Sequence, residues 1–359
     1  MRGTVRGGQG PVKTDFHPLV VARVEPLTDD SAAITFRVPG NLADVFTFAP
    51  GQSLTLRRGD ERRSYSICAV AGSAPRIGVR EVAGGAVSGW LVHELKAGDT
   101  VEAQVPSGTF TPDLTVPAQH VLIAAGSGIT PMMSIAASVL AADDKSTVTL
   151  LYGNRRSETV MFADEVADLK DAYPARMRII HVLSREAQEV DLFSGRLDRD
   201  RLTELLPVTV NVAGVDHWWL CGPFGMVTDA VDVLAGLDVD PHRIHRELFW
   251  VGDEPPAEAT HDESPPGDGA SVTVVLDGRS STLTVPAGTA ILDGAQKVRP
   301  DLPFACKGGV CGTCRAKVTS GAGTMRRNYA LEPHEVDAGY VLTCQTVPTS
   351  DEITVDYDG

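Results

Sequence analysis

The sequence has few basic residues, only six cysteines and no apolar run near its start, and each shortage excludes a class of protein. Lysine and arginine number 32 against 47 aspartates and glutamates, which gives a formal net charge of −15 over 359 residues. Because phosphate backbones bind basic surfaces, this balance argues against a nucleic-acid partner. Residues Met1 to Lys13 contain glycines and basic side chains but no apolar segment, so we expect no signal peptide.

One apolar stretch, Val121 to Ala142, is long enough to suggest a membrane span. It is interrupted by Gly126-Ser-Gly-Ile-Thr-Pro131, which favours a strand, a loop and then a buried helix. Cys68 and Cys221 lie in apolar segments, so a secreted disulfide framework is not expected. We therefore expect a soluble, cytoplasmic protein with no membrane partner.

Length and sequence pattern divide the chain into three folded domains. Short β-rich runs between turns, over residues 15–115, predict an antiparallel barrel or sandwich. Residues 116–250 alternate apolar strands with helical patterns, which is typical of a parallel sheet covered on both faces. Residues 271–359 contain two strands, a short helix and a cysteine-rich loop, and predict a small α+β domain.

The remaining segments lack the composition of a folded core. Residues 1–14 are expected to be a disordered N-terminus. Residues 251–270 contain four prolines, six acidic residues and no lysine or arginine, which is typical of a linker. Such a linker suggests that the last domain moves between the rest of the chain and a partner.

The strongest motif is a set of four cysteines in the last domain. Cys306, Cys311 and Cys314 follow the spacing C-x4-C-x2-C, and Cys344 lies further along the chain. This is the plant-type ligand pattern of a [2Fe–2S] cluster. A four-cysteine zinc site is the alternative, but zinc usually takes paired C-x2-C hooks. The pattern therefore predicts a cluster that carries one electron at a time.

Two motifs of the first domain are candidates for binding a phosphate and a ring. Arg63-Ser64-Tyr65-Ser66 can offer a guanidinium, an aromatic ring and hydroxyls to one ligand. Gly84-Gly85-Ala-Val87-Ser88 precedes a helix expected over residues 87–94 with Ser88 as its cap, where free amides favour an anion. An exposed strand edge and an ordinary glycine turn are the respective alternatives.

The α/β domain carries candidate dinucleotide motifs. Gly126 and Gly128 lead into Thr130 and Pro131, which we expect at the N-cap and N1 positions of a helix, so a pyrophosphate can approach the helix end. The pattern G-x-G-x-x-P departs from the G-x-G-x-x-G fingerprint and disfavours an ordinary Rossmann dehydrogenase.

Further candidates lie at the ends of three strands. Arg155 and Arg156 end the second strand where an acid would bind a ribose, which favours NADPH over NADH. Ser184-Arg185 follows the third strand and suits the same 2′-phosphate. Cys221-Gly222-Pro223 ends a strand at the edge where open α/β sheets bind ligands. Solvated loop arginines and a cysteine that only packs are the alternatives.

Together these motifs resemble the ferredoxin-NADP reductase superfamily over residues 15–359. The matching segments are Pro50-Gly51-Gln52, Arg63-Ser-Tyr65-Ser66, Gly85-Ala-Val-Ser88, Gly126-Ser-Gly-Ile-Thr-Pro131 and Cys221-Gly-Pro223. The cysteine domain narrows the resemblance to reductase components of bacterial multicomponent oxygenases. Asn328-Tyr-Ala-Leu-Glu332 and Ala338-Gly-Tyr-Val-Leu-Thr-Cys344-Gln look most like the reductase subunits of phenylacetyl-CoA epoxidases. Reductases of Rieske oxygenases, including ketosteroid hydroxylases, are the alternative.

The resemblance implies a fold, cofactors and residue roles. It implies a six-stranded antiparallel barrel holding FAD (FMN is the alternative), an α/β nicotinamide domain and a β-grasp [2Fe–2S] domain. It implies that Ser66, Cys221 and Glu247 act where hydride passes from nicotinamide to flavin. The other implied cofactor-binding residues are Arg63, Ser64, Tyr65, Arg80, Gly85, Val87, Ser88, Thr130 and Phe249 for the flavin, and Gly126, Gly128, Arg155, Arg156, Ser184, Arg185, Gly222 and Pro223 for the nucleotide.

The three motif sets predict an NAD(P)H-dependent oxidoreductase that feeds a separate oxygenase. A flavin is needed between the other two groups because nicotinamide gives up two electrons together while the cluster accepts one. Two other functions remain open. A flavin reductase that releases its flavin would have no use for the cluster domain, and a non-catalytic iron–sulfur redox-sensing module would bind no flavin.

Overall fold

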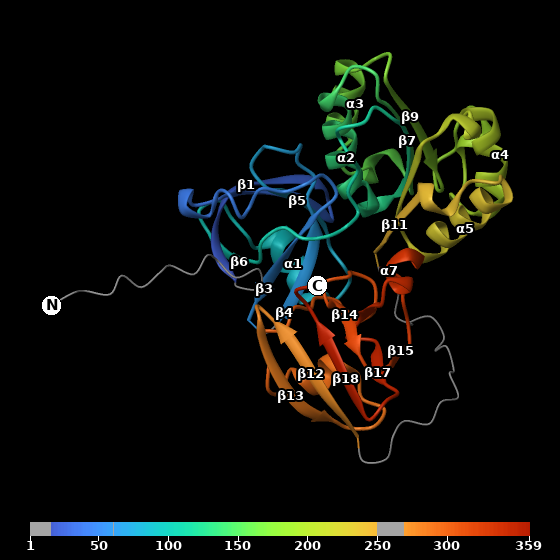
Figure 1. Ribbon diagram of the computed structural model, residues 1–359. Helices are drawn as coiled ribbons and strands as arrows, with labels where there is room; N and C mark the ends of the chain where they lie inside the picture. The colour runs from blue at the N-terminus through green and yellow to red at the C-terminus, as the bar shows by residue number, and fades with distance from the viewer. Residues whose placement is uncertain (1–15, 60, 250–268) are drawn as a thin grey trace.

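The computed structural model describes residues 16–59, 61–249 and 269–359 and groups them into three domains (Figure 1). The expectations for residues 1–14 and for nearly all of the linker at 251–270 lie outside the described residues. The last domain lies against both of the others, near β4 of the first and α5 of the second (Figure 1).

The first domain is an antiparallel sheet in the strand order β4-β3-β6-β1-β2-β5. Its strands are β1 (His17–Thr28), β2 (Ser31–Arg37), β3 (Ser53–Arg58), β4 (Glu61–Ser66), β5 (Arg76–Arg80) and β6 (Thr100–Ala103), with a 3₁₀ turn η1 (Gly40–Leu42). A bridge between Ile67 and Ile77 joins the two outer strands and closes the sheet into a barrel. The expected six-stranded antiparallel barrel is therefore confirmed.

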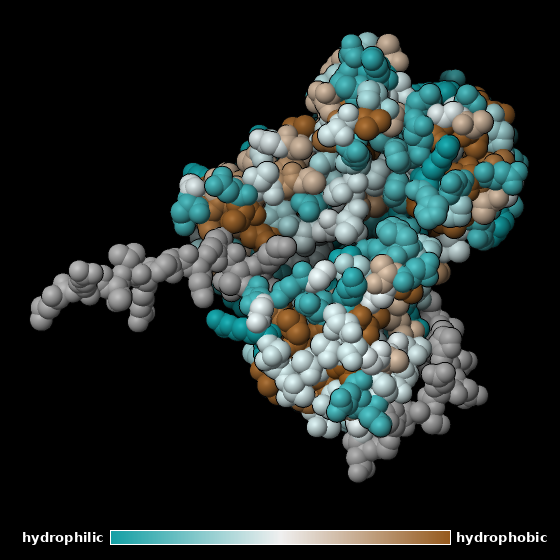
Figure 2. All heavy atoms as spheres, viewed as in Figure 1, coloured by the Kyte–Doolittle hydropathy of each residue, from teal (hydrophilic) through white to brown (hydrophobic). Residues whose placement is uncertain are grey.

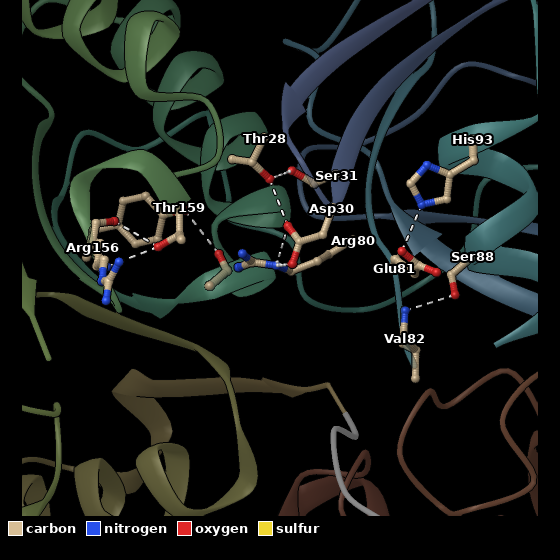
Figure 3. Close-up of polar contacts among 12 residues, drawn as sticks. Thr28, Asp30, Ser31, Arg80, Glu81, Val82, Ser88, His93, Arg156 and Thr159 are labelled. Carbon is tan, nitrogen blue, oxygen red and sulfur yellow. Dashed lines mark hydrogen bonds and ion pairs between the residues drawn. The ribbon is translucent and has the colours of Figure 1, made fainter. Parts of the chain in front are cut away.

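Helix α1 (Ala86–His93) lies where a helix was expected, but its start differs from the prediction. Gly85 is the N-cap residue, and no side chain caps the helix. The Ser88 hydroxyl instead accepts a hydrogen bond from the Val82 amide at 3.1 Å and donates to the Gly85 carbonyl at 3.3 Å (Figure 3). The predicted Ser88 cap is wrong because this hydroxyl orders the loop that leads into the helix.

The second domain is a five-stranded parallel sheet in the order β11-β10-β7-β8-β9. Its strands are β7 (Gln119–Ala125), β8 (Thr147–Asn154), β9 (Met177–Leu183), β10 (His217–Gly222) and β11 (Ile244–Leu248). Helices α2 (Ile129–Ala142) and α3 (Ala163–Ala172) pack on one face, and α4 (Arg199–Thr209) and α5 (Phe224–Gly236) on the other. This confirms the expected α/β domain, and the face of it that is seen in Figure 2 is mostly hydrophilic.

Short 3₁₀ turns connect these elements. They are η2 (Gly126–Gly128), η3 (Ser157–Thr159), η4 (Asp191–Phe193), η5 (Val212–Gly214) and η6 (Pro241–Arg243). Strand β11 was not predicted as a strand. Only its two end residues are buried, so it lacks the continuous apolar run of the inner strands.

The turn before α2 departs from the prediction. Residues 126–128 form η2, and α2 begins at Ile129 with Gly128 as its N-cap residue. Thr130 and Pro131 are therefore the second and third helical residues, and their predicted places at N-cap and N1 are wrong. A Cβ atom on Gly128 would lie 2.1 Å from the Cys221 carbonyl oxygen, so glycine lets this turn pack onto the end of β10.

The third domain is a mixed sheet in the order β13-β12-β18-β14-β16, with a separate pair of β15 and β17. Its elements are β12 (Ala270–Leu276), β13 (Arg279–Val285), α6 (Ile291–Ala295), β14 (Arg315–Ser320), β15 (Gly323–Met325), α7 (Pro333–Asp337), β16 (Tyr340–Leu342), β17 (Thr346–Pro348) and β18 (Glu352–Asp356). Strands β12 and β18 are parallel and the other pairs antiparallel, as expected for a β-grasp domain.

Within the described ranges, no helix combines the length and the apolar character needed to cross a bilayer. The apolar stretch from Val121 to Ala142 contains α2, a helix of 14 residues. Eleven of its residues are buried in the α/β domain, so its apolar character is explained by packing.

Candidate functional site

A cavity of about 590 Å³ lies where the three domains meet, a size that suits one large cofactor. Residues of all three domains line it. The barrel supplies Arg63, Ser64, Tyr65, Ser66, Arg80, Gly85, Val87 and Ser88, the α/β domain supplies Ser127, Glu247 and Phe249, and the last domain supplies Cys306, Gly308, Val310, Cys311 and Arg327. The residues expected at the flavin and those expected at the cluster therefore face one space.

Strand β4 connects the barrel to both other domains through alternate residues. Ser64 Oγ lies 2.9 Å from Thr55 Oγ1 on β3 and 3.3 Å from Thr313 Oγ1 in the cysteine loop. Ser66 is 4% exposed and donates a hydrogen bond to Glu247 Oε2 at 3.2 Å. Ser64 and Ser66 are two residues apart and lie on the same face of the strand. Ser64 contacts the last domain, and Ser66 contacts the α/β domain.

The intervening residues of β4 offer a cation and a ring to the cavity. The Arg63 guanidinium pairs with Glu61 at 2.7 Å and also donates to the Arg62 carbonyl. Tyr65 is half-buried, and burial raises the pKa of its phenol well above the usual value, so the ring stays neutral. A phosphate in the cavity would compete with Glu61 for Arg63.

Arg80 is held in place at the cavity wall by a partly exposed network of hydrogen bonds. Its Nε pairs with Asp30 at 2.9 Å, and Asp30 also accepts a hydrogen bond from Thr28 at 2.8 Å (Figure 3). Burial acts to raise the pKa of Asp30, but the hydrogen bonds from Arg80 and Thr28 hold it below its usual value. Asp30 therefore stays ionised and orients Arg80.

Cys221 and Glu247 are partners on the adjacent strands β10 and β11. Cys221 is 0% exposed, and burial raises the pKa of its thiol well above the usual value, so the thiol stays neutral. Burial also raises the pKa of Glu247 to about 7, against the opposing effect of the Ser66 hydrogen bond. Glu247 therefore holds a proton over part of the neutral range, at the junction of the barrel and the α/β domain.

Three other predicted residues lie around this junction. The Phe249 side chain lines the cavity, and the Phe249 amide donates to the Gly222 carbonyl at 3.3 Å. Thr130 is 1% exposed, and its hydroxyl donates to the Ser127 carbonyl at 2.8 Å. Ser127, which the sequence analysis missed, lines the cavity, whereas Thr130 does not. Pro223 is the N-cap residue of α5.

The candidate 2′-phosphate residues come from two loops that run side by side. The Ser184 amide donates to the Asn154 carbonyl at 2.9 Å, and the Arg185 amide donates to the Arg155 carbonyl at 2.8 Å. Arg156 lies next to Thr159 (Figure 3), and its amide donates to Thr159 Oγ1 at 3.1 Å.

Two acids that the sequence analysis did not consider accompany these arginines. Glu158 pairs with Arg156 at 3.3 Å. Glu186 accepts hydrogen bonds from the Ser157 hydroxyl and amide, which lower the pKa of its carboxyl. Glu186 directly follows the candidate Arg185, but its contact with Ser157, which lies 29 positions earlier in the chain, is visible only in the structure.

The four cysteines of the last domain come together as two pairs. Cys306 lies beside Cys311, and Cys314 lies beside Cys344. The Gly308 and Cys311 amides donate to Cys306 Sγ at 3.3 and 3.4 Å. These amides would stabilise a thiolate ligand and tune a bound metal centre.

The donor arrangement can be compared with the two candidate metal centres. Among the described residues, no three acidic, histidine or cysteine side chains surround a single point as one metal ion requires. Two pairs of thiols suit a cluster in which each of two irons takes two cysteines. The residues present therefore fit a [2Fe–2S] cluster and disfavour the zinc alternative.

Comparisons with known proteins agree with this arrangement. Residues 122–232 match the family model described as oxidoreductase NAD-binding domain, and residues 274–349 match that of the 2Fe-2S iron-sulfur cluster binding domain. The chain is 41% identical to a component of the 1,2-phenylacetyl-CoA epoxidase of Escherichia coli (strain K12), over 96% of this chain and 98% of that one. It is 35% identical to the 3-ketosteroid-9-alpha-monooxygenase ferredoxin reductase component of Mycobacterium tuberculosis (strain ATCC 25618 / H37Rv), over 98% of both chains.

The fold also matches a solved structure with all three domains. Phthalate dioxygenase reductase, described as modular for electron transfer from pyridine nucleotides to [2Fe–2S], superposes with a TM-score of 0.58 at 23% identity. The superposition covers 95% of this chain and 98% of the other. The resemblance read from the motifs is thereby confirmed: the chain belongs to the ferredoxin-NADP reductase superfamily, as an oxygenase reductase component with an antiparallel barrel, a nicotinamide domain and a fused [2Fe–2S] domain.

Proposed function

We propose that this protein carries electrons from NADPH to the oxygenase component of a phenylacetyl-CoA epoxidase. The observation that carries the proposal is the single cavity shared by the flavin motif and the cysteine loop. The 41% identity to an epoxidase component over nearly the full length of both chains supports the choice of oxygenase. When bound, FAD accepts a hydride from NADPH and releases single electrons that the [2Fe–2S] cluster carries onward.

The chain's own residues bind and orient these groups. Arg63 and the amides of residues 85–88 would hold the flavin phosphates, and Tyr65 would offer its ring to the flavin. Ser66 and Glu247 hold a proton at the Glu247 carboxyl oxygens, beside the position where nicotinamide and flavin meet. Cys221 is a buried neutral thiol that shapes this position by packing.

The cluster ligands are Cys306, Cys311, Cys314 and Cys344. The amides that donate to Cys306 Sγ lie within the loop that carries three of the four ligands, so this loop supplies both ligation and tuning. Gln345 Nε2 lies 3.8 Å from Cys344 Sγ and donates to the Lys307 carbonyl at 2.8 Å, which connects the distant ligand to this loop.

The preference for NADPH rests on Arg155 and Arg185. Neither makes an ion pair in the described part of the chain, whereas Arg156 is engaged by Glu158. Two free guanidinium groups at the ends of adjacent strands suit a 2′-phosphate, because arginine binds phosphate through two parallel hydrogen bonds.

Reconstitution tests the proposal directly. Holoprotein with verified flavin and iron content would be mixed with the oxygenase component of a phenylacetyl-CoA epoxidase or of a 3-ketosteroid monooxygenase, NADPH and the matching substrate. We expect oxygenated product from phenylacetyl-CoA only. Product from the steroid alone would favour the second candidate, which the 35% identical relatives support. Purified protein that binds no flavin would contradict both candidate functions.

A further inference from the structure

The cavity between the three domains is lined by three arginines, and one of them comes from the last domain. Arg63 and Arg80 belong to the barrel, whereas Arg327 lies between β15 and α7 of the last domain. No other basic residue among the described ones lines this cavity, and Glu247 is the one acidic residue of its described wall. The wall is therefore basic in a chain whose formal net charge is −15, which favours an anionic ligand.

The three arginines differ in the partners that the chain itself gives them. Arg63 pairs with Glu61 at 2.7 Å, and Arg80 pairs with Asp30 at 2.9 Å. Arg327 is half-buried and makes no ion pair with any acidic side chain in the described part of the chain. Since partly burying a cation without a counterion is costly, Arg327 is the arginine of this wall that most needs an anionic ligand.

The backbone at Arg327 is held beside the cysteine loop. The Tyr329 amide donates to the Gly309 carbonyl at 3.0 Å, and the Arg326 amide donates to the Gln345 carbonyl at 2.9 Å. A Cβ atom on Gly309 would lie 3.2 Å from the Arg327 carbonyl oxygen, so glycine lets the two segments approach closely. Arg327 is therefore positioned by the same loop that carries three of the cysteine ligands.

The two phosphates of FAD need separate partners. Arg63 and the amides of residues 85–88 account for the phosphate on the ribityl chain, which FMN also has. The second phosphate carries the adenosine and is present only in FAD. Arg80 lies against the glycine turn of the α/β domain, since a Cβ atom on Gly126 would be 3.4 Å from Arg80 Nη1. Arg327 remains, and a guanidinium without a carboxylate partner can bind a phosphate through two parallel hydrogen bonds.

We propose that Arg327 binds the phosphate of FAD that FMN lacks, so that a residue of the last domain determines which flavin the barrel retains. The flavin site is then a composite of two domains that are distant in the sequence. The selectivity comes from charge and from hydrogen-bond geometry at one position. This rests on the proposed function, because it takes FAD as the flavin and Arg63 as the partner of its first phosphate.

Binding of three flavins to one protein tests the proposal. Flavin is removed anaerobically from the holoprotein, and iron content and visible absorption verify that the cluster is retained. The protein is then titrated with FAD, FMN or riboflavin, and quenching of flavin fluorescence gives each Kd. We expect Arg327→Met to raise the Kd for FAD about 10- to 150-fold, the effect of losing a charge-assisted hydrogen bond, and to leave those for FMN and riboflavin unchanged.

The neighbouring arginine provides a matched control. Arg326→Met removes the same charge from the adjacent position, but the Arg326 side chain donates to the Gly288 carbonyl and does not line the cavity. We expect its Kd for FAD to equal that of the wild type. Arg327→Lys keeps the charge and loses the planar fork, so its Kd for FAD should lie between those of the wild type and Arg327→Met.

The outcomes separate this proposal from the function itself. An Arg327→Met protein that binds FAD as tightly as the wild type would overturn the proposal. Weaker binding of FAD and FMN with riboflavin unchanged would overturn it as well, because the contact would then be with the shared phosphate. Equal weakening of all three flavins would reveal a purely structural role and have the same consequence. If the wild type bound none of the three flavins, the proposed function would fail instead.

Discussion

Replacing Glu247 by glutamine should change the pH dependence of both stability and hydride transfer. The change keeps the shape of the side chain and its capacity to accept the Ser66 hydrogen bond, and removes only the charge. Burial raises the pKa of this carboxyl from 4.5 to about 7. The folded protein therefore keeps a proton that the unfolded chain releases between these two values. The wild type loses stability from this group as the pH rises from 4.5 to 7, and the full cost remains above 7.

The magnitude follows from the size of the pKa difference. At about 1.36 kcal/mol for each pH unit, ionising Glu247 in the folded state costs about 3 kcal/mol. The carboxyl borders the cavity, so water screens part of this cost, and we expect about 2 kcal/mol. Relative to wild type, Glu247→Gln should therefore gain about 2 kcal/mol of unfolding free energy between pH 5 and pH 8.5.

Urea unfolding of the FAD-saturated protein at the two pH values measures this change. Tryptophan fluorescence reports on the α/β domain that contains Glu247, because Trp218 and Trp219 of β10 are at most 1% exposed. Histidines also titrate in this domain: burial lowers the pKa values of His120 and His245 to about 4. Their contribution is common to both proteins and cancels in the comparison.

Hydride transfer provides the second readout. The rate of flavin reduction by NADPH should change near pH 7 in the wild type and be flat there in Glu247→Gln. A stability difference between the two proteins that is the same at pH 5 and 8.5 would refute the assigned pKa. A wild-type rate without any change between pH 6 and 8 would refute its role in the site.

Three further predictions concern the cluster, the nucleotide and the turn before α2. Cys311→Ser should abolish cytochrome c reduction while NADPH oxidation with ferricyanide survives; equal loss of both in a folded protein would contradict the order of the relay. The double variant Arg155→Leu/Arg185→Leu removes charge-assisted hydrogen bonds worth about 1.5–3 kcal/mol. The KM for NADPH should therefore rise about 10- to 150-fold, while the KM for NADH stays constant. An equal rise in KM for both nucleotides would exclude 2′-phosphate binding by these arginines. Gly128→Ala would place a Cβ atom 2.1 Å from the Cys221 carbonyl oxygen and should lower the free energy of unfolding by about 3 kcal/mol or more, as measured by thermal or urea unfolding. The control Gly225→Ala, whose Cβ atom would have nothing within 4 Å, should lower it by under about 1 kcal/mol. Equal effects of the two changes would refute the close approach at Gly128.

The expectations that rested on the local spacing of apolar residues and turns predicted the architecture well. The parallel sheet was visible in its inner strands, which are continuous apolar runs such as Val121 to Ala125. Strand β11 was missed because it is an edge strand whose middle residues are only partly buried. The caps at Ser88 and Thr130 were predicted from residue type, and both were wrong because each hydroxyl hydrogen-bonds to the backbone of the loop that precedes its helix.

The sequence by itself determined the family and the three-domain architecture, because both are encoded in short motifs whose members lie within a few residues of one another. Only the tertiary structure decided how those motifs meet. Ser66 and Glu247 are 181 residues apart, and Ser64 and Thr313 are 249 apart, yet each pair is in contact. The raised pKa of Glu247 and the approach of Cys344 to the cysteine loop both depend on such distant contacts, since burial and close approach are properties of the assembled fold.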